Sequence, residues 1–346
     1  MVNAFYLIFI ISSVFAFFDF FYSEKVKNIS YWFSVFVITI IFSARDYSIG
    51  AGGDTEAYVE AYKQIGNLDF YQMMQFGWEP GYVVLNKLIY ILFNGDDRCF
   101  VILMSILIIL PIAKYIKQIS PLPNFCLLFF IASGGFIHVG LFRQMLAFSI
   151  ILYGFKYLKS ESCGYFNLIK FAAIICMASL FHLTALLFSF VYFIKPKVTV
   201  NALFMSFLVS LLVYLFGASI YDFLIKLSRI NYTMITDGGL NKSIFLYCVA
   251  VLALVFCKKV INDNYKVDAS LFMTVVALQP FCLVFGLASR VLIYFELSVV
   301  IVMSVLLNAF LDKGNRAEFV MCVNLLVIYL AYQMFIYSKY QQYMIF

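Results

Sequence analysis

Long runs without a charged residue constrain this chain more than any other feature, and Val198 to Phe216 is one example. A membrane-spanning helix needs about 20 mainly apolar residues, whereas strands of a membrane barrel would alternate apolar and polar positions. The runs do not alternate, so they predict helices. Only 12% of the residues are charged and 64% are hydrophobic, which leaves no room for a sizeable soluble domain. We therefore predict an all-α polytopic membrane protein, with residues 1–346 as a single integral membrane domain.

The apolar runs predict about twelve transmembrane helices. The first begins MVNAFYLIFIISSVFAFF, which lacks a basic start and a small-residue cleavage site, so we expect a retained span rather than a signal peptide. The stretch 81–93 is short and carries Lys87, which predicts a surface-lying or re-entrant helix. The predicted spans are 2–22, 29–44, 99–113, 123–138, 142–158, 165–181, 183–194, 198–216, 243–257, 269–287, 291–311 and 317–338.

Lysines indicate which connections face the cytoplasm. The most basic connections, near Lys25, Lys114, Lys156, Lys195, Lys258 and Lys313, all fall on one face if 81–93 does not cross. Both termini are then outside, with an external loop at 45–98 containing amphipathic helices and a second one at 217–242. The first loop holds eight of the eighteen acidic residues, which sidedness alone explains.

Arginines follow the opposite pattern to the lysines. Five of the six fall on the predicted outer face, and only Arg316 joins the lysines. A guanidinium group forms a rigid fork that matches phosphate and carboxylate oxygens. The pattern therefore indicates an anion-binding role outside the membrane for some of the group Arg45, Arg98, Arg143, Arg229 and Arg290.

The first external loop contains two candidate carboxylates, Asp54 and Glu79. Asp54 follows a glycine-rich run, 50–53, and opens a helical stretch, so it is either a helix cap or a catalytic group. Trp78 adjoins Glu79 and suits stacking on a sugar ring, although aromatic residues are abundant throughout this chain.

Two histidines and a glutamine lie near candidate arginines. Arg143 and Gln144 begin an apolar run, so Arg143 is either a snorkelling side chain at a helix end or a ligand for an anion. His138 lies just before them. His182 lies between two apolar stretches near the membrane surface, where it serves either as a base or in a structural hydrogen bond.

Arg290 separates two long apolar stretches and is followed by Tyr294 and Glu296. Glu296 could neutralise Arg290, or Arg290 could bind an anion in an outward-facing cavity. The loop 217–242, which includes Arg229, is either a helix on the membrane surface or a lid.

Composition also argues against metal and nucleic-acid chemistry. Eight cysteines are scattered without a CxxC pair, and two histidines cannot form a histidine-rich metal site. The net charge of +6 follows from inward-facing lysines and does not indicate nucleic acid. We expect no metal and no cofactor.

Together these residues resemble the Wzy class of O-antigen and exopolysaccharide repeat-unit polymerases, in the EpsG-like branch. The resemblance is carried, in order along the chain, by Arg45 ahead of GGDTEAY, WEPGY around Glu79, FRQMLA around Arg143, FHLTAL around His182 and SRVLIYF around Arg290.

This resemblance implies a metal-independent glycosyltransferase similar to the polyprenyl-phosphate-dependent (GT-C-like) enzymes, in the bacterial inner membrane with its active site facing the periplasm. It would transfer a glycan from undecaprenyl diphosphate to an undecaprenyl-diphosphate-linked repeat unit, in lipopolysaccharide or exopolysaccharide biosynthesis. The lipid bilayer and a chain-length regulator protein are the other partners implied.

The residues suit that chemistry. Diphosphate departure builds negative charge that Arg143 and Arg290 would stabilise, with Arg45 in support. The acceptor hydroxyl needs a proton acceptor, for which His182, Glu79 and Asp54 are candidates in that order. Trp78, Gln144, His138, Tyr294 and Arg229 are candidate substrate contacts.

Three other classes remain as alternatives. A lipid-linked oligosaccharide flippase would also present arginines to a diphosphate, but it often shows two related halves, and the sequence contains no internal repeat. An O-antigen ligase shares the donor chemistry, but its long external segment is expected late in the chain. A membrane acyltransferase would carry paired cytoplasmic motifs, which we do not find.

Overall fold

The computed structural model describes residues 2–44, 54–135, 140–159, 165–193, 198–228, 239–283, 286–312 and 344–345. The chain divides into two compact units. Unit 1 comprises Met1–Ser189 and Val320–Phe346, and unit 2 comprises Phe190–Phe319. Each unit is described by itself below. The predicted site residues Arg45, His138 and Arg229, the glycine run 50–53 and the predicted span 317–338 lie outside the described residues.

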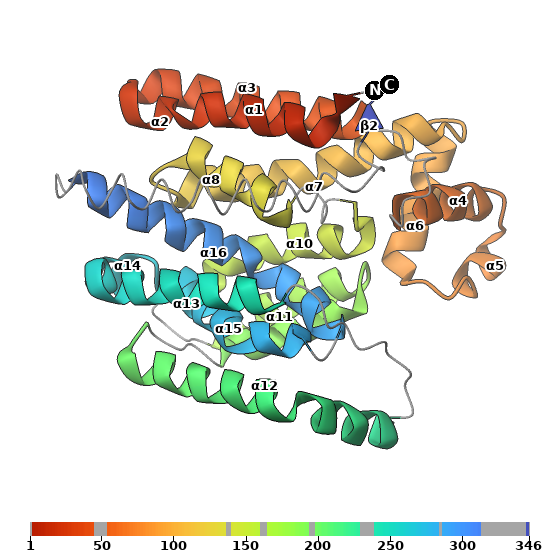
Figure 1. Ribbon diagram of the computed structural model, residues 1–346. Helices are drawn as coiled ribbons and strands as arrows, with labels where there is room; N and C mark the ends of the chain where they lie inside the picture. The colour runs from red at the N-terminus through yellow and green to blue at the C-terminus, as the bar shows by residue number, and fades with distance from the viewer. Residues whose placement is uncertain are drawn as a thin grey trace. The chain divides into compact units, whose positions relative to one another are not determined.

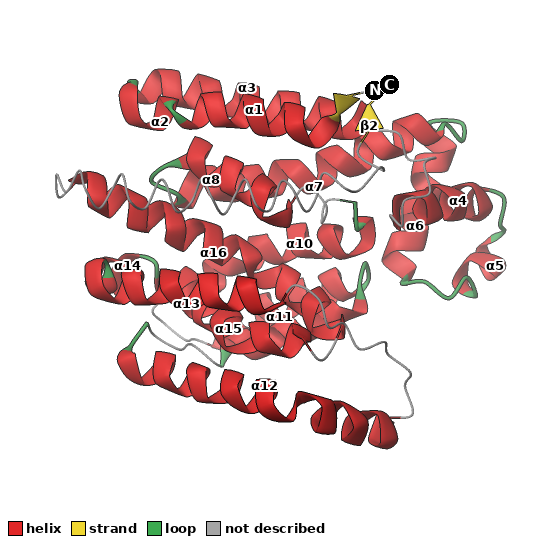
Figure 2. Ribbon diagram, in the orientation of Figure 1, coloured by secondary structure: helices red, strands yellow, loops and turns green. Residues whose placement is uncertain are grey.

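Helices make up nearly all of the described chain (Figures 1 and 2), which confirms the predicted all-α class. The strands among the described residues are a two-residue antiparallel pair, β1 (Val2–Asn3) with β2 (Met344–Ile345). The pair brings two distant parts of unit 1 together, with Val2 opposite Ile345.

Unit 1 contains ten α-helices among its described residues, together with one π-helical and one 3-10 segment. They are α1 (Ala4–Ala16), α2 (Phe18–Phe21), α3 (Glu24–Ala44), α4 (Asp54–Gly66), α5 (Phe70–Met74), α6 (Pro80–Leu92), α7 (Asp97–Ile119), α8 (Pro123–Phe130), η1 (Ile131–Gly135), α10 (Phe142–Lys159), α11 (Tyr165–Ser179) and η2 (Leu183–Tyr192), the last of which runs on into unit 2.

Unit 2 contains α12 (Val200–Ser228), α13 (Gly239–Phe256), α14 (Lys258–Asn264), α15 (Lys266–Leu278), η3 (Gln279–Leu283) and α16 (Gly286–Asp312). Helix α16 packs against α13 and α15 and contributes much of the buried apolar surface of this unit. Helix α12 continues to Ser228, so the first part of the predicted loop 217–242 is helical.

Four helical segments among the described residues are long and apolar enough to cross a membrane: Glu24–Ala44, Asp97–Ile119, Val200–Gly217 and Arg290–Leu311. Six shorter apolar helices accompany them, among them Pro80–Leu92 and Tyr165–Ser179. The chain is therefore a helical membrane protein, and the count of twelve crossings stays a prediction. Within the predicted stretch 183–194, Leu183–Tyr192 form a 3-10 helix rather than an α-helix.

Helix α6 has thirteen residues, which is shorter than the about 20 residues of a perpendicular span. Its Lys87 donates hydrogen bonds to the carbonyls of Gly66, at 2.7 Å, and Leu68, at 2.9 Å. A positive charge is favourable at those carbonyls, because a helix ends with unpaired carbonyl groups. Lys87 thus joins α6 to the end of α4, and the placement of α6 relative to the bilayer stays a prediction.

A buried carboxylate joins the first helices of unit 1 to α8. Asp19 accepts hydrogen bonds from the backbone amide of Phe125, at 2.9 Å, and from the side chain of Asn124, at 2.8 Å. Helix α8 has no side-chain cap of its own at Leu122. Asp19 therefore satisfies an amide of the first turn from a distant part of the chain.

The start of α6 lies directly against the end of α11. The amide of Tyr82 donates to the carbonyl of Leu180 at 3.2 Å. A Cβ atom on Gly81 would lie 2.8 Å from both the Cβ and the carbonyl oxygen of Leu180. Gly81 therefore permits a backbone approach that a larger residue would prevent, and this approach brings Glu79 next to His182.

We expect Gly81→Ala to destabilise the protein by about 1–3 kcal/mol, because the added methyl group overpacks against backbone atoms that cannot rotate away. Thermal unfolding of the purified protein in detergent, at one scan rate, measures the effect. Val84→Ala, on an exposed position of the same helix, is the matched control. An unchanged melting temperature for Gly81→Ala would contradict the close contact between α6 and α11.

Candidate functional site

Glu79 occupies the N-cap position of α6, and Pro80 follows it as the first helical residue. Proline suits this position because its fixed φ matches a helix and no amide hydrogen is lost. The residue before a proline is restricted to extended backbone, and Glu79 has φ −61° and ψ 134°. Its side chain does not cap its own helix, so both carboxylate oxygens are available to other elements.

The first of these oxygens, Oε2, binds Arg143 from the first turn of α10. The Nε atom of Arg143 donates to Oε2 at 2.9 Å, and Nη2 makes a second, short contact with the same oxygen. Both side chains are largely buried, with 19% of Arg143 and 13% of Glu79 exposed. The contact engages two of the five N–H donors of the guanidinium group, so three lie outside it.

The second oxygen, Oε1, binds the segment that follows α11. It accepts a hydrogen bond from the backbone amide of Leu183 at 3.0 Å and lies 3.1 Å from Nδ1 of His182. His182 is 16% exposed. The carboxylate of Glu79 therefore joins α6, α10 and the start of η2, all within unit 1.

Aromatic rings form the wall beside this carboxylate. The guanidinium carbon of Arg143 lies 4.7 Å from the ring centroid of Trp78, within the range of a cation–π contact. Tyr58 on α4 contacts Trp78 and Tyr82 edge-on and stacks on Phe142. These rings hold the first turns of α4, α6 and α10 together around the site.

The pKa of Glu79 reflects this environment. Burial would raise the pKa, but the hydrogen bonds from His182 and from the Leu183 amide, together with the charge of Arg143, lower it from 4.5 to about 2. Glu79 is therefore ionised at neutral pH. A carboxylate that binds protons so weakly is suited to orienting its neighbours rather than to accepting a proton from a hydroxyl group.

The geometry can support two chemical tasks. A histidine that binds a carboxylate through Nδ1 is held in one orientation, and its Nε2 is the nitrogen outside that contact. A guanidinium group held at the same carboxylate can present its remaining N–H groups to an anion. The arrangement thus places a histidine and a guanidinium group that could serve these two tasks at one carboxylate.

Four of the predicted site residues come together here: Glu79, Arg143, His182 and Trp78. Asp54 is exposed at the start of α4, and the neighbouring Thr55 donates to the carbonyl of Gly140, just before α10, at 3.4 Å. Gln144 is buried on α10. The roles predicted for Asp54 and Gln144 stay predictions.

Two of the predicted residues that the structure describes belong to unit 2. Arg290 is exposed on α16, whereas only 1% of Tyr294 is exposed. Glu296, which could have neutralised Arg290, forms an ion pair with Lys242 of α13. The proposal that Arg290 acts on the same diphosphate as Arg143 stays a prediction.

The sequence reasoning missed three contributors to the site: the Leu183 amide, Gly81 and the ring of Tyr58. A backbone amide leaves no signal in a sequence. The Glu-Pro-Gly order offered a usable signal, since it predicts a helix start with an extended glutamate before it. Within the described residues, no group of three or more His, Cys, Asp or Glu side chains could hold a metal ion, and metal independence stays a prediction.

Comparison with known proteins agrees with a helical membrane protein. A model of the EpsG family matches residues 29–345, nearly the whole chain. The chain therefore belongs to the EpsG family, a Wzy-like polymerase family, as the resemblance implied. This membership indicates a polysaccharide polymerase of the glycosyltransferase kind. Neither the curated proteins nor the solved structures contain a match.

The lowered pKa of Glu79 predicts how stability depends on pH. A carboxyl group with a depressed pKa stabilises the folded state above its unfolded-state value, here 4.5, and loses that contribution as the pH falls toward about 2. The contribution is on the order of 2–3 kcal/mol. Thermal unfolding between about pH 3 and pH 7 should show a steeper acid loss for the natural protein than for Glu79→Gln.

Glu60→Gln removes an exposed carboxylate from α4 and is the control, because it should retain the steep acid loss. If the curves of the natural protein and Glu79→Gln ran parallel below pH 4.5, the ionised Glu79 would not be held as described.

Proposed function

We propose that this protein polymerises lipid-linked oligosaccharide repeat units, in O-antigen or exopolysaccharide biosynthesis. The donor is a glycan on undecaprenyl diphosphate, and the acceptor is a sugar hydroxyl of an undecaprenyl-diphosphate-linked repeat unit at the periplasmic face of the bacterial inner membrane. One observation carries the proposal beyond family membership: Glu79 binds both Arg143 and His182. An anion-binding group and a proton acceptor at one place are what glycosyl transfer from a diphosphate requires.

In the proposed reaction, the bond between the donor sugar and the diphosphate breaks, and the diphosphate leaves with the electron pair. The acceptor hydroxyl oxygen forms the new glycosidic bond, and its proton passes to Nε2 of His182. Arg143 stabilises the charge that grows on the departing diphosphate. Glu79 is a positioning residue, since it orients His182 and Arg143 without contacting the substrate.

Arg290 and Arg45 are the other proposed diphosphate ligands. The exposure of Arg290 at the start of α16 suits an anion that approaches from outside the unit. A chain-length regulator would act on the same protein as a partner in the membrane.

Deleting the gene and separating the surface glycan on a gel tests the class of function. Loss of the ladder with a surviving single-repeat band supports a polymerase. Complete loss of the glycan would instead support a flippase or a ligase.

We expect Arg143→Lys and Arg290→Lys each to lower polymer formation by about 10²–10³-fold, since lysine keeps the charge but loses the fork. Glycan gels report the polymer, and immunoblots of membranes report protein abundance, which should stay near normal. Lys63→Arg, in an exposed ion pair with Asp97, is the control and should make normal polymer. Full-length polymer from either variant would remove that arginine from the diphosphate role.

We expect His182→Asn to lower polymer formation by about 10²–10⁴-fold, because the amide can replace Nδ1 at Glu79 but cannot accept the acceptor proton. The single-repeat lipid-linked substrate should accumulate, and the melting temperature should stay close to that of the natural protein. His182→Ala loses the Glu79 contact as well and should also lower the melting temperature. Normal polymer from His182→Asn would exclude His182 as the base.

A further inference from the structure

Arg98 is an arginine of the predicted outer face for which the proposed function gives no role. It lies in the first turn of α7, and its Nη1 donates to the carbonyl of Ser43, near the end of α3, at 3.2 Å. Both helices belong to unit 1.

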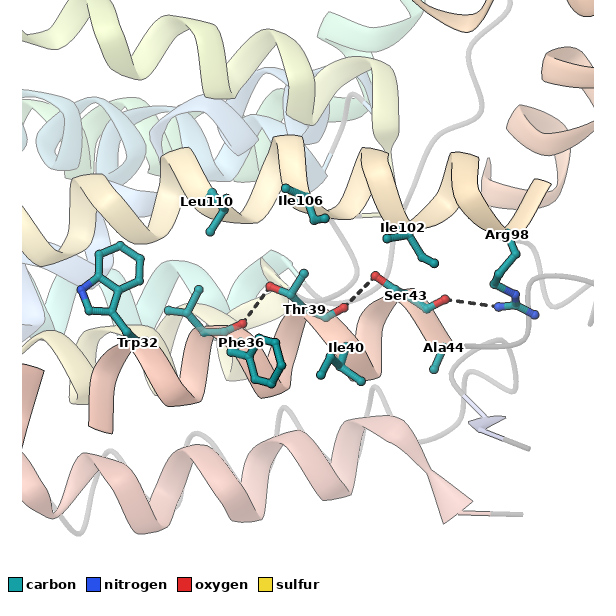
Figure 3. Close-up of a pocket in the computed structure, with 11 residues that line it drawn as sticks. Trp32, Phe36, Thr39, Ile40, Ser43, Ala44, Arg98, Ile102, Ile106 and Leu110 are labelled. Carbon is teal, nitrogen blue, oxygen red and sulfur yellow. Dashed lines mark hydrogen bonds between the residues drawn. The ribbon is translucent and has the colours of Figure 1, made fainter. Parts of the chain in front are cut away.

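A groove of about 620 Å³ runs between α3 and α7, a volume in the range of ligand pockets in proteins. Figure 3 shows side chains of the two helices facing each other along it, with Trp32 toward one end and Arg98 at the other. The residues that line it are Trp32, Val35, Phe36, Thr39, Ile40, Ser43, Ala44, Arg98, Ile102, Ile106 and Leu110.

The walls of the groove are mostly apolar, and their hydroxyl groups are already hydrogen-bonded within their own helix. Its two hydroxyl groups donate their protons to their own helix: Thr39 to the carbonyl of Val35 and Ser43 to that of Thr39, each at 2.7 Å (Figure 3). Among the described residues that line the groove, Arg98 is the only charged one. The groove therefore suits a long apolar chain with one anionic group at the Arg98 end.

The length of the groove suits the first few isoprene units of an extended chain. Trp32 to Ala44 on α3 and Arg98 to Leu110 on α7 each correspond to a rise of about 18 Å. Phe36 is 60% exposed and Ile40 is 49% exposed, so the groove opens sideways, where a membrane protein meets lipid.

The charged end of the groove lies at the same end of unit 1 as the candidate site. Phe100, two residues after Arg98, contacts the ring of Phe142 edge-on at 5.8 Å, and Phe142 directly precedes Arg143. A chain in the groove would thus have its anionic group at the end of the unit where Glu79, Arg143 and His182 meet.

We propose that this groove holds the phosphate-proximal part of the isoprenoid chain of the lipid-linked substrate, with its phosphate at Arg98. This inference rests on the proposed function and adds the place where the lipid binds. An isoprenoid phosphate, rather than a bilayer phospholipid, fits because one long apolar chain carries one anionic group at its end.

The chain has only two tryptophans, Trp32 in the groove and Trp78 in the candidate site, so Trp78→Phe leaves Trp32 as the sole reporter. The full-length variant is placed in nanodiscs of phospholipid with brominated acyl chains, which quench tryptophan. Undecaprenyl phosphate is then added. If its unbrominated chain displaces the acyl chains, Trp32 fluorescence rises and saturates.

Undecaprenol and unbrominated phosphatidylglycerol are the comparison lipids, and each should need at least about tenfold more for the same rise. Arg98→Gln should raise the half-saturating amount of undecaprenyl phosphate about tenfold or more. Ile106→Phe should also weaken the response, because it fills the groove. Leu107→Phe, one position further along α7 and outside the lining, should not.

An equal response to undecaprenol would overturn the role of Arg98, and an equal response to phosphatidylglycerol would assign the groove to bulk lipid. An absent response, or one unchanged in both Arg98→Gln and Ile106→Phe, would overturn the inference as a whole. The measurement involves no sugar and no turnover. If this binding test fails while the protein polymerises normally, only the lipid-binding role of the groove is rejected. If the lipid binds normally but the protein makes no polymer, only the proposed reaction is rejected.

Discussion

The candidate site depends on one ionised carboxylate held out of water. Glu79 is 13% exposed, and an ionised group in such a place is costly unless charges and hydrogen bonds compensate for it. Compensation comes from three parts of the chain: the guanidinium of Arg143, the ring of His182 and the amide of Leu183. The same contacts that keep Glu79 charged therefore fix the two groups suited to chemistry.

Unit 1 separates its apolar and polar tasks along its helices. The middle turns of α3 and α7 supply an apolar groove, whereas charged side chains lie at helix starts: Glu79 directly before α6, Arg98 in the first turn of α7 and Arg143 in that of α10. An aromatic contact between Phe100 and Phe142 joins the starts of α7 and α10. Such a division suits the proposed substrate, because its lipid tail would contact the apolar groove and its charged, sugar-bearing head would contact the charged helix starts.

The sequence predicted much of the fold and part of the site. Most apolar runs coincide with observed helices because apolar side chains without charges leave the chain few other ways to satisfy its backbone in a membrane. Glu79, Arg143, His182 and Trp78 stood out as polar or amphipathic groups beside apolar helices. Their individual roles did not follow. Glu79 ranked among the candidate bases, yet its low pKa favours a role in orienting Arg143 and His182. Arg143 and Arg290 belong to different units, so their joint binding of one diphosphate stays a prediction.

By itself, the sequence determined the class of the protein, the positions of most helices and, through Pro80, the start of α6, since hydropathy and the fixed φ of proline act over a few neighbouring residues. Only the tertiary structure decided which helix ends meet. Arg143 and His182 lie 64 and 103 residues from Glu79, and an apolar periodicity shows that a helix face is buried without showing against what. The close packing at Gly81 and the aromatic contacts around Tyr58 determine which helix ends lie together.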